Sequence, residues 1–175
     1  MIINVDNLEK ISDNRLKLER ILKLKIIIRE KEVTIEGKPE DEFIGEKVIN
    51  ALDFDFPVDV ALMIKRDDFL FEILNIKDFT RRKDLEIVRA RIIGTGGKTL
   101  RTLNNLTGCY FEIKDNEVGV IGAPEKIKNA QDAVVSIIQG AKQANVYSYL
   151  EKHQVRPIED LGLKEPKKKG KKAKE

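Results

Sequence analysis

Residues 91–100 of the chain read RIIGTGGKTL, with three glycines in four positions followed by a lysine and a threonine. A glycine-rich turn that opens a helix exposes backbone N–H groups, and such a turn commonly holds a phosphate. The P-loop is one turn of this kind, but it requires a preceding strand and a glycine five residues before its Gly-Lys-Ser/Thr. Ile92 occupies that position here, and the residues before it follow a helical pattern. The stretch therefore indicates a turn between two helices, which suits the phosphates of a nucleic-acid backbone.

The chain contains an internal repeat with a period of 85 residues. The segment EVTIEGKPE, which starts at Glu32, aligns without a gap on EVGVIGAPE, which starts at Glu117. Leu18 falls on Leu103 in the same register. Self-similarity of this kind indicates the duplication of one structural unit.

The second copy has the clearer secondary-structure signals. Leucines at helical spacing precede Gly108, which is a natural helix end, and two short apolar runs after it predict a hairpin. Pro124 then stands where the first turn of a helix tolerates proline. The predicted elements are strands 69–76, 109–113 and 118–122, helices 82–93 and 143–153, and, in the first copy, helix 13–22, strands 24–30 and 32–36 and helix 40–52, with a linking helix in 57–64.

Each copy therefore predicts a three-stranded sheet with helices on one face, which is an α+β sandwich. No Gly/Ser-rich linker separates the copies, so we expect the two units to pack together. The expected domains are residues 1–68 and 69–153, followed by a disordered lysine-rich tail, 154–175.

The net charge of +3 conceals a division between the two halves of the chain. Residues 1–76 hold 12 Lys and Arg against 17 Asp and Glu, whereas residues 77–153 hold 13 against 9. The segment 164–175 adds seven lysines and two glutamates. An acidic first half and a basic second half predict different partners for the two units.

The residues around the glycine turn form a candidate RNA-binding site. The glycines allow a backbone to approach closely, cations on either side favour phosphate, and neighbouring isoleucines favour bases that are splayed into a groove. The candidate residues are Arg89, Arg91, Ile92, Ile93, Gly94, Thr95, Gly96, Gly97, Lys98, Arg101 and Ile113.

The pattern IIGTGGKT…L..L..LTG, followed by a hairpin and a helix, resembles the type I KH domain, whose G-x-x-G loop holds about four nucleotides. The wider pattern, RARIIGTGGKTLRTLNNLTG with VGVIGAPEKIKNAQDAV and GAKQANVYSYLEKH, resembles the partner-of-Nob family of small-subunit ribosome assembly factors. The resemblance implies a protein of two tandem type I KH domains that binds single-stranded RNA near the 3′ end of small-subunit rRNA. It also implies that they assist the endonuclease that matures this end and perform no chemistry themselves.

The resemblance further implies that the first KH unit lacks a working loop. In the 85-residue register, the loop falls on Glu9, Lys10, Ile11 and Ser12, without a glycine and with a carboxylate first. We therefore expect the first unit to dock ribosome assembly or translation proteins rather than RNA.

Two other interpretations remain open from the sequence. One is a general regulator that binds mRNA or small RNA, and the other is a nucleotide-binding enzyme or switch that uses Gly97-Lys98-Thr99. Cys109 is predicted to be a buried thiol and His153 a surface residue, so neither a zinc site nor a Cys-His pair is expected. We expect no catalytic residue, metal, cofactor, small-molecule substrate or membrane partner. The single cysteine favours a reducing compartment, and a cytoplasmic location is expected.

Overall fold

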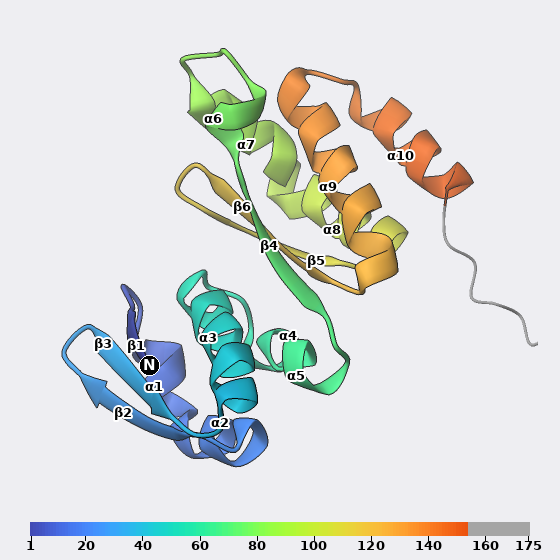
Figure 1. Cartoon of the computed structure of the whole chain (residues 1–175). Coiled ribbons are helices and arrows are strands. Elements are labelled where there is room, and N and C mark those ends of the chain that lie inside the picture. Colours follow the sequence, from blue (N-terminus) through green and yellow to red (C-terminus); the bar gives the residue numbers. More distant parts are fainter. Residues whose placement is uncertain (154–175) are drawn as a thin grey trace, which may run out of the picture.

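The computed structural model describes residues 1–153 (Figure 1), so the predicted lysine-rich tail lies outside the described residues. Two units follow one another along the chain, and both contain a strand, two helices, a hairpin and a further helix in this order, to which the second unit adds short elements and a C-terminal helix. The first comprises β1 (Ile2–Asn4), α1 (Glu9–Asp13), α2 (Arg15–Leu22), β2 (Lys25–Arg29), β3 (Glu32–Glu36) and α3 (Pro39–Asp53). Two short helices link the units, α4 (Val58–Ala61) and α5 (Met63–Arg66). The second comprises β4 (Leu70–Asn75), α6 (Ile76–Phe79), α7 (Leu85–Ile93), the 3-10 turn η1 (Thr95–Gly97), α8 (Lys98–Thr107), β5 (Tyr110–Lys114), β6 (Glu117–Gly122), α9 (Pro124–Gln139) and α10 (Gln143–Lys152).

Each unit has an antiparallel three-stranded sheet in which the last strand lies in the middle. The strand orders are β1-β3-β2 and β4-β6-β5. In the second sheet the hairpin runs from the pair Tyr110 and Ile121 to the pair Lys114 and Glu117. The predicted α+β class with KH-type sheets is confirmed.

Local signals fix the ends of several helices. Pro39 and Pro124 stand in the first turns of α3 and α9, and Gly108 ends α8 in the left-handed conformation. Helix α7 starts three residues later than predicted because the Asp84 side chain accepts a hydrogen bond from the N–H of Ile87. The segment predicted as one helix at 57–64 is divided into α4 and α5, and the short elements β1, α1 and α6 were not predicted.

The prediction that residues 9–12 form the turn between two helices is wrong. They belong to α1, and Ile11 is fully buried in the core of the first unit. Only Asn14 joins α1 to α2, and its side-chain amide donates a hydrogen bond to the carbonyl of Lys10 at 2.9 Å. Burial of Ile11 stabilises a helix here, so the register of the repeat holds only from α2 onward.

The central strand of the second sheet, β6, is buried on both faces. Phe111, Val118 and Val120 pack with its own helices. On the other face, Gly119 lies against Phe54 and Phe56 of the first unit, where an added Cβ would lie 2.8 Å from ring carbons. Ile121 belongs to the buried core of the first unit. The two units therefore pack directly against each other, and this explains why the apolar run of β6 does not alternate with polar residues.

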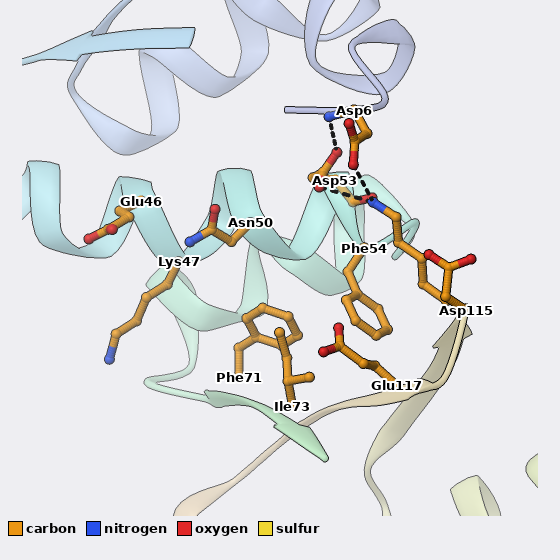
Figure 2. Close-up of a pocket in the computed structure, with 11 residues that line it drawn as sticks. Asp6, Glu46, Lys47, Asn50, Asp53, Phe54, Phe71, Ile73, Asp115 and Glu117 are labelled. Atoms are coloured by element: carbon orange, nitrogen blue, oxygen red, sulfur yellow. Dashed lines mark hydrogen bonds and ion pairs between the residues drawn. The ribbon is translucent and has the colours of Figure 1, made fainter. Parts of the chain in front are cut away.

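An open cleft of about 620 Å³ marks the rim of this interface, between α3 and the strands of the second sheet (Figure 2). Beside it, Lys114 Nζ lies 3.0 Å from a carboxylate oxygen of Asp53 and 3.9 Å from one of Asp6. Burial alone would raise the pKa of Asp53, but hydrogen bonds from the backbone N–H groups of Asn7 and Asp6 and from Lys114 outweigh burial and hold that pKa below its usual range. The carboxylate of Asp53 thus joins the residues after β1 to α3 and, through Lys114, to the second unit.

None of the helices in residues 1–153 is long and apolar enough to cross a membrane.

Candidate nucleic-acid interface

The backbone of the glycine turn favours glycine at three positions. Gly94 ends α7 with φ 73° and ψ 170°, and Gly96 and Gly97 adopt left-handed conformations with φ 59° and 73°. A Cβ at Gly94 would overlap the Thr99 hydroxyl and lie 2.7 Å from the Thr99 nitrogen. At Gly96 and Gly97 a Cβ would have no neighbour within 4 Å. The start of the turn is therefore closely packed, whereas its tip is open for a ligand.

A glutamine from α10 forms hydrogen bonds to the residues on both sides of the glycine turn. Gln143, the first residue of α10, donates one hydrogen bond to the Arg91 carbonyl at 2.9 Å and another to the Thr99 hydroxyl at 3.0 Å. These bonds join the end of α7 to the start of α8, where Thr99 is buried. Sequence reasoning missed Gln143, because nothing in its local pattern connects it to a turn 44 residues away in sequence.

Positive charge surrounds the exposed tip. Thr95, Gly96 and Lys98 are exposed, and Lys98 opens α8. Arg101 follows one turn later and donates a hydrogen bond to the Gly96 carbonyl at 2.7 Å, which holds the guanidinium beside the tip. The N–H groups at the start of a helix favour an anion, so the helix and both cations favour the same ligand charge.

Arg89 and Arg91 are engaged in the structure itself. Arg89 donates hydrogen bonds to the Asp115 carbonyl at 2.9 Å and to the Asn116 side chain at 3.1 Å, both in the turn between β5 and β6. Arg91 donates to the Ala141 carbonyl at 2.9 Å, just before α10. These bonds hold α7 between its neighbours, and the contact of the two arginines with phosphate stays a prediction.

The apolar surface near the turn differs from the predicted one at one residue. Ile92 is fully buried in the core, so it cannot line an open groove as predicted. Ile93 is 37% exposed. Leu100 on α8 and Ile113 on β5 are half-buried at the border of the same core. Leu100 is therefore an additional candidate for contact with the bases. The sequence pattern placed it only among the leucines at helical spacing before Gly108.

Two other candidate chemistries find little support in the geometry. A helix, not a strand, precedes Gly97-Lys98-Thr99, and the Thr99 hydroxyl that a P-loop would direct at Mg²⁺ is buried against Gln143. Cys109 is buried, and burial raises the pKa of its thiol. His153 is exposed and stacks on Tyr149. Residues 1–153 contain no group of three or more His, Cys, Asp or Glu side chains that could hold a metal ion.

Comparison with known proteins agrees with this geometry. Residues 70–155 match the family model described as "Eukaryotic type KH-domain (KH-domain type I)". A pre-rRNA-processing protein PNO1 of Debaryomyces hansenii is 31% identical over 139 residues, which are 74% of this chain and 54% of that protein. A KH domain-containing protein of Methanocaldococcus jannaschii is 28% identical over 108 residues, 61% of this chain and 48% of the relative. The chain thus spans about half the length of these relatives.

Solved structures extend the likeness to the whole fold. Dim2p of Pyrococcus horikoshii superposes with a TM-score of 0.80 at 24% identity, covering 87% of this chain and 98% of that one. A chain from the complex of a/eIF2alpha, aDim2p and rRNA of the same organism gives 0.79 at 24% identity, covering 87% and 92%. Residues 70–155 therefore resemble type I KH domains, and the chain is similar to the PNO1 proteins and has the fold of Dim2p.

Proposed function

We propose that this chain binds single-stranded RNA near the 3′ end of small-subunit rRNA and assists its maturation without chemistry of its own. The observation that carries the proposal is the exposed tip of the turn, Thr95 to Gly97, with Lys98 and Arg101 beside it. The names of the relatives support the RNA as the target, since one is a pre-rRNA-processing protein and one structural neighbour was solved with rRNA.

The proposed contacts follow from the geometry. Backbone N–H groups at the start of α8, together with Lys98 and Arg101, bind phosphates of the RNA backbone, because glycine lets the strand approach closely. The unstacked bases pack on the apolar surface of Ile93, Leu100 and Ile113. Arg89, Arg91 and Gln143 act indirectly by holding the two helices and the β5–β6 turn in place, and Gly94 gives the turn its shape.

We assign the two units different tasks. Residues 69–153 are the RNA-binding KH domain with an additional helix, and residues 1–68 are a degenerate KH domain. In the register that holds from α2 onward, Leu16 replaces Arg101, and Leu16 is 78% exposed. An exposed apolar side chain in place of a cation favours protein over phosphate, so the first unit docks ribosome assembly or translation proteins.

The decisive experiment places negative charge on the tip in the full chain. The variant Thr95→Asp with Gly96→Asp sets two carboxylates against the phosphates, and Asp tolerates the left-handed conformation of Gly96 better than most residues. Its matched control is Thr95→Asn with Gly96→Asn, which has the same shape without the charge. Fluorescence anisotropy with an oligonucleotide of the small-subunit rRNA 3′ end should show at least a tenfold loss of affinity for the Asp variant relative to the Asn variant. Equal affinity in two folded variants would reject this site.

Two further measurements separate the remaining interpretations. An arbitrary single strand of the same length, added as a competitor, should compete more weakly than the rRNA 3′ end; equal competition would favour a general regulator. Leu16→Gln should leave the RNA affinity unchanged, and a clear loss would instead place the first unit on the RNA.

A further inference from the structure

Ion pairing differs sharply between the two units. Within the part of the chain that the structure describes, six of the twelve lysines and arginines of the first unit and its linker pair with carboxylates, for example Lys17 with Asp59 and Lys65 with Asp41. Among the cations of residues 69–153, Lys114 is the one that forms such a pair, and its partners belong to the first unit. Most cations of the described part of the second unit thus form no ion pair with a carboxylate.

Three of these cations are consecutive. Arg81, Arg82 and Lys83 are all exposed and lie in the loop between α6 and α7; we call them the Arg81–Lys83 cluster. The loop is shaped by a hydrogen bond from the Arg82 N–H to the Thr80 hydroxyl at 3.2 Å. The next residue, Asp84, uses its carboxylate to cap α7. Like charges in sequence repel one another, so their concentration on one short loop favours an anionic partner.

The cluster and the glycine turn lie at opposite ends of one helix. Helix α7 runs from the loop after α6 toward α8 (Figure 1), and its nine residues span about 13 Å. The outward face of α7 carries Ile87, Ala90 and Ile93, with Glu86 as its carboxylate. Two cationic ends are therefore joined by a mostly apolar helix face.

We propose that the Arg81–Lys83 cluster is a second phosphate-binding site for the same RNA strand, which continues along α7 beyond the groove at the glycine turn. This inference rests on the proposed function, because it extends the RNA path that begins there. The continuity of the helix between the two sites and the charge of the cluster select RNA as the occupant. The RNA footprint of the chain is then longer than the four nucleotides that one KH loop holds.

Counterion release gives the expected size of the effect. Each phosphate of a single strand that a protein neutralises adds about 0.7 to the slope of log affinity against log salt concentration. Three contacts therefore add about 2 to this slope. Over a fourfold increase in salt concentration, the additional loss of RNA affinity is roughly 20-fold.

The test uses the full chain with two RNAs, one of four nucleotides and one extended by several nucleotides at both ends. The variant Arg81→Gln, Arg82→Gln, Lys83→Gln should bind the short RNA like the wild type in an NMR titration. It should bind the extended RNA more weakly, with a salt slope lower by about 2. The matched control, Arg20→Gln, Arg29→Gln, Lys38→Gln, removes three exposed cations from the first unit and should leave both RNAs unaffected.

Three outcomes would overturn the inference. An unchanged slope with the extended RNA would mean that the cluster is merely solvated or binds another partner. An equal loss in the control variant would indicate a general charge effect. Weaker binding of the short RNA would place the cluster at the groove itself. Failure of the proposed function would look different, since the Thr95→Asp, Gly96→Asp variant would then retain its affinity for both RNAs.

Discussion

Replacing Gly94 by alanine should unfold the second unit far more readily than the same replacement at Gly96, two residues away. At Gly94, φ 73° and ψ 170° fall in a region that is almost restricted to glycine, at a cost of about 1–3 kcal/mol for another residue. The new Cβ would also overlap the buried Thr99, and overpacking of this kind costs about 1–3 kcal/mol. Together, the two effects should lower the free energy of unfolding of the Gly94→Ala variant by about 4 kcal/mol.

In the Gly96→Ala variant, only the strained backbone conformation lowers the stability. Its left-handed conformation costs an alanine about 1–2 kcal/mol, and the open space around it adds nothing. Urea unfolding followed by circular dichroism should therefore separate the two variants by about 2 kcal/mol or more. In a chain of this size, 1 kcal/mol shifts the melting temperature by about 2–4 °C, so a thermal scan should also resolve them.

Equal unfolding midpoints for Gly94→Ala and Gly96→Ala would refute the packing argument. That result would mean that Thr99 can move aside in spite of its hydrogen bond from Gln143. The Gly96→Ala protein, which should remain folded under assay conditions, also allows RNA affinity to be measured without a change in fold.

Three more predictions concern stability and reactivity. Ile92→Ala should cost about 2–5 kcal/mol because Ile92 is fully buried, whereas Ile93→Ala should cost far less in urea unfolding yet weaken RNA binding; the reverse order would overturn the assignment of the two residues. Burial, with repulsion from Asp55, raises the pKa of Glu112, so the ionised form destabilises the fold above the unfolded-state pKa of about 4.3. Glu112→Gln should therefore raise the melting temperature at pH 7 but not at pH 3.5, and an equal gain at both would contradict this cause. Cys109 should resist alkylation in the native state and react on unfolding, as followed by mass spectrometry; rapid labelling of the folded protein would show that the thiol is accessible.

The sequence predicted those parts of the fold that carry strong local signals. Prolines and glycines at the ends of helices, and apolar runs of five or six residues, identified most elements of both units. Strand β1 has three residues and α1 five, which is too short for a periodic pattern. Residues 9–12 were misplaced because an ungapped repeat register cannot show where one copy has shortened its connection between helices.

The sequence predicted the part of the site that depends on backbone conformation. It predicted less well which side chains point toward the ligand. Three glycines within four residues predict a turn without any further information. Ile92 and Ile93 are identical neighbours, and the packing of α7, which buries Val88 together with Ile92, determines which one is buried. The bonds of Arg89 and Arg91 go to backbone carbonyls, which carry no residue-type signal in a sequence.

The packing of the second sheet on Phe54 and Phe56 has a consequence during synthesis. Chains fold from the N-terminus as they emerge, but the partner surface of these rings includes Gly119 and Ile121, more than sixty residues later. The nascent first unit therefore exposes two phenylalanines until β6 is made. Truncated chains that end before β6 should be prone to aggregation or need a chaperone, and expression of the first unit alone is an unsuitable route to studying its partners.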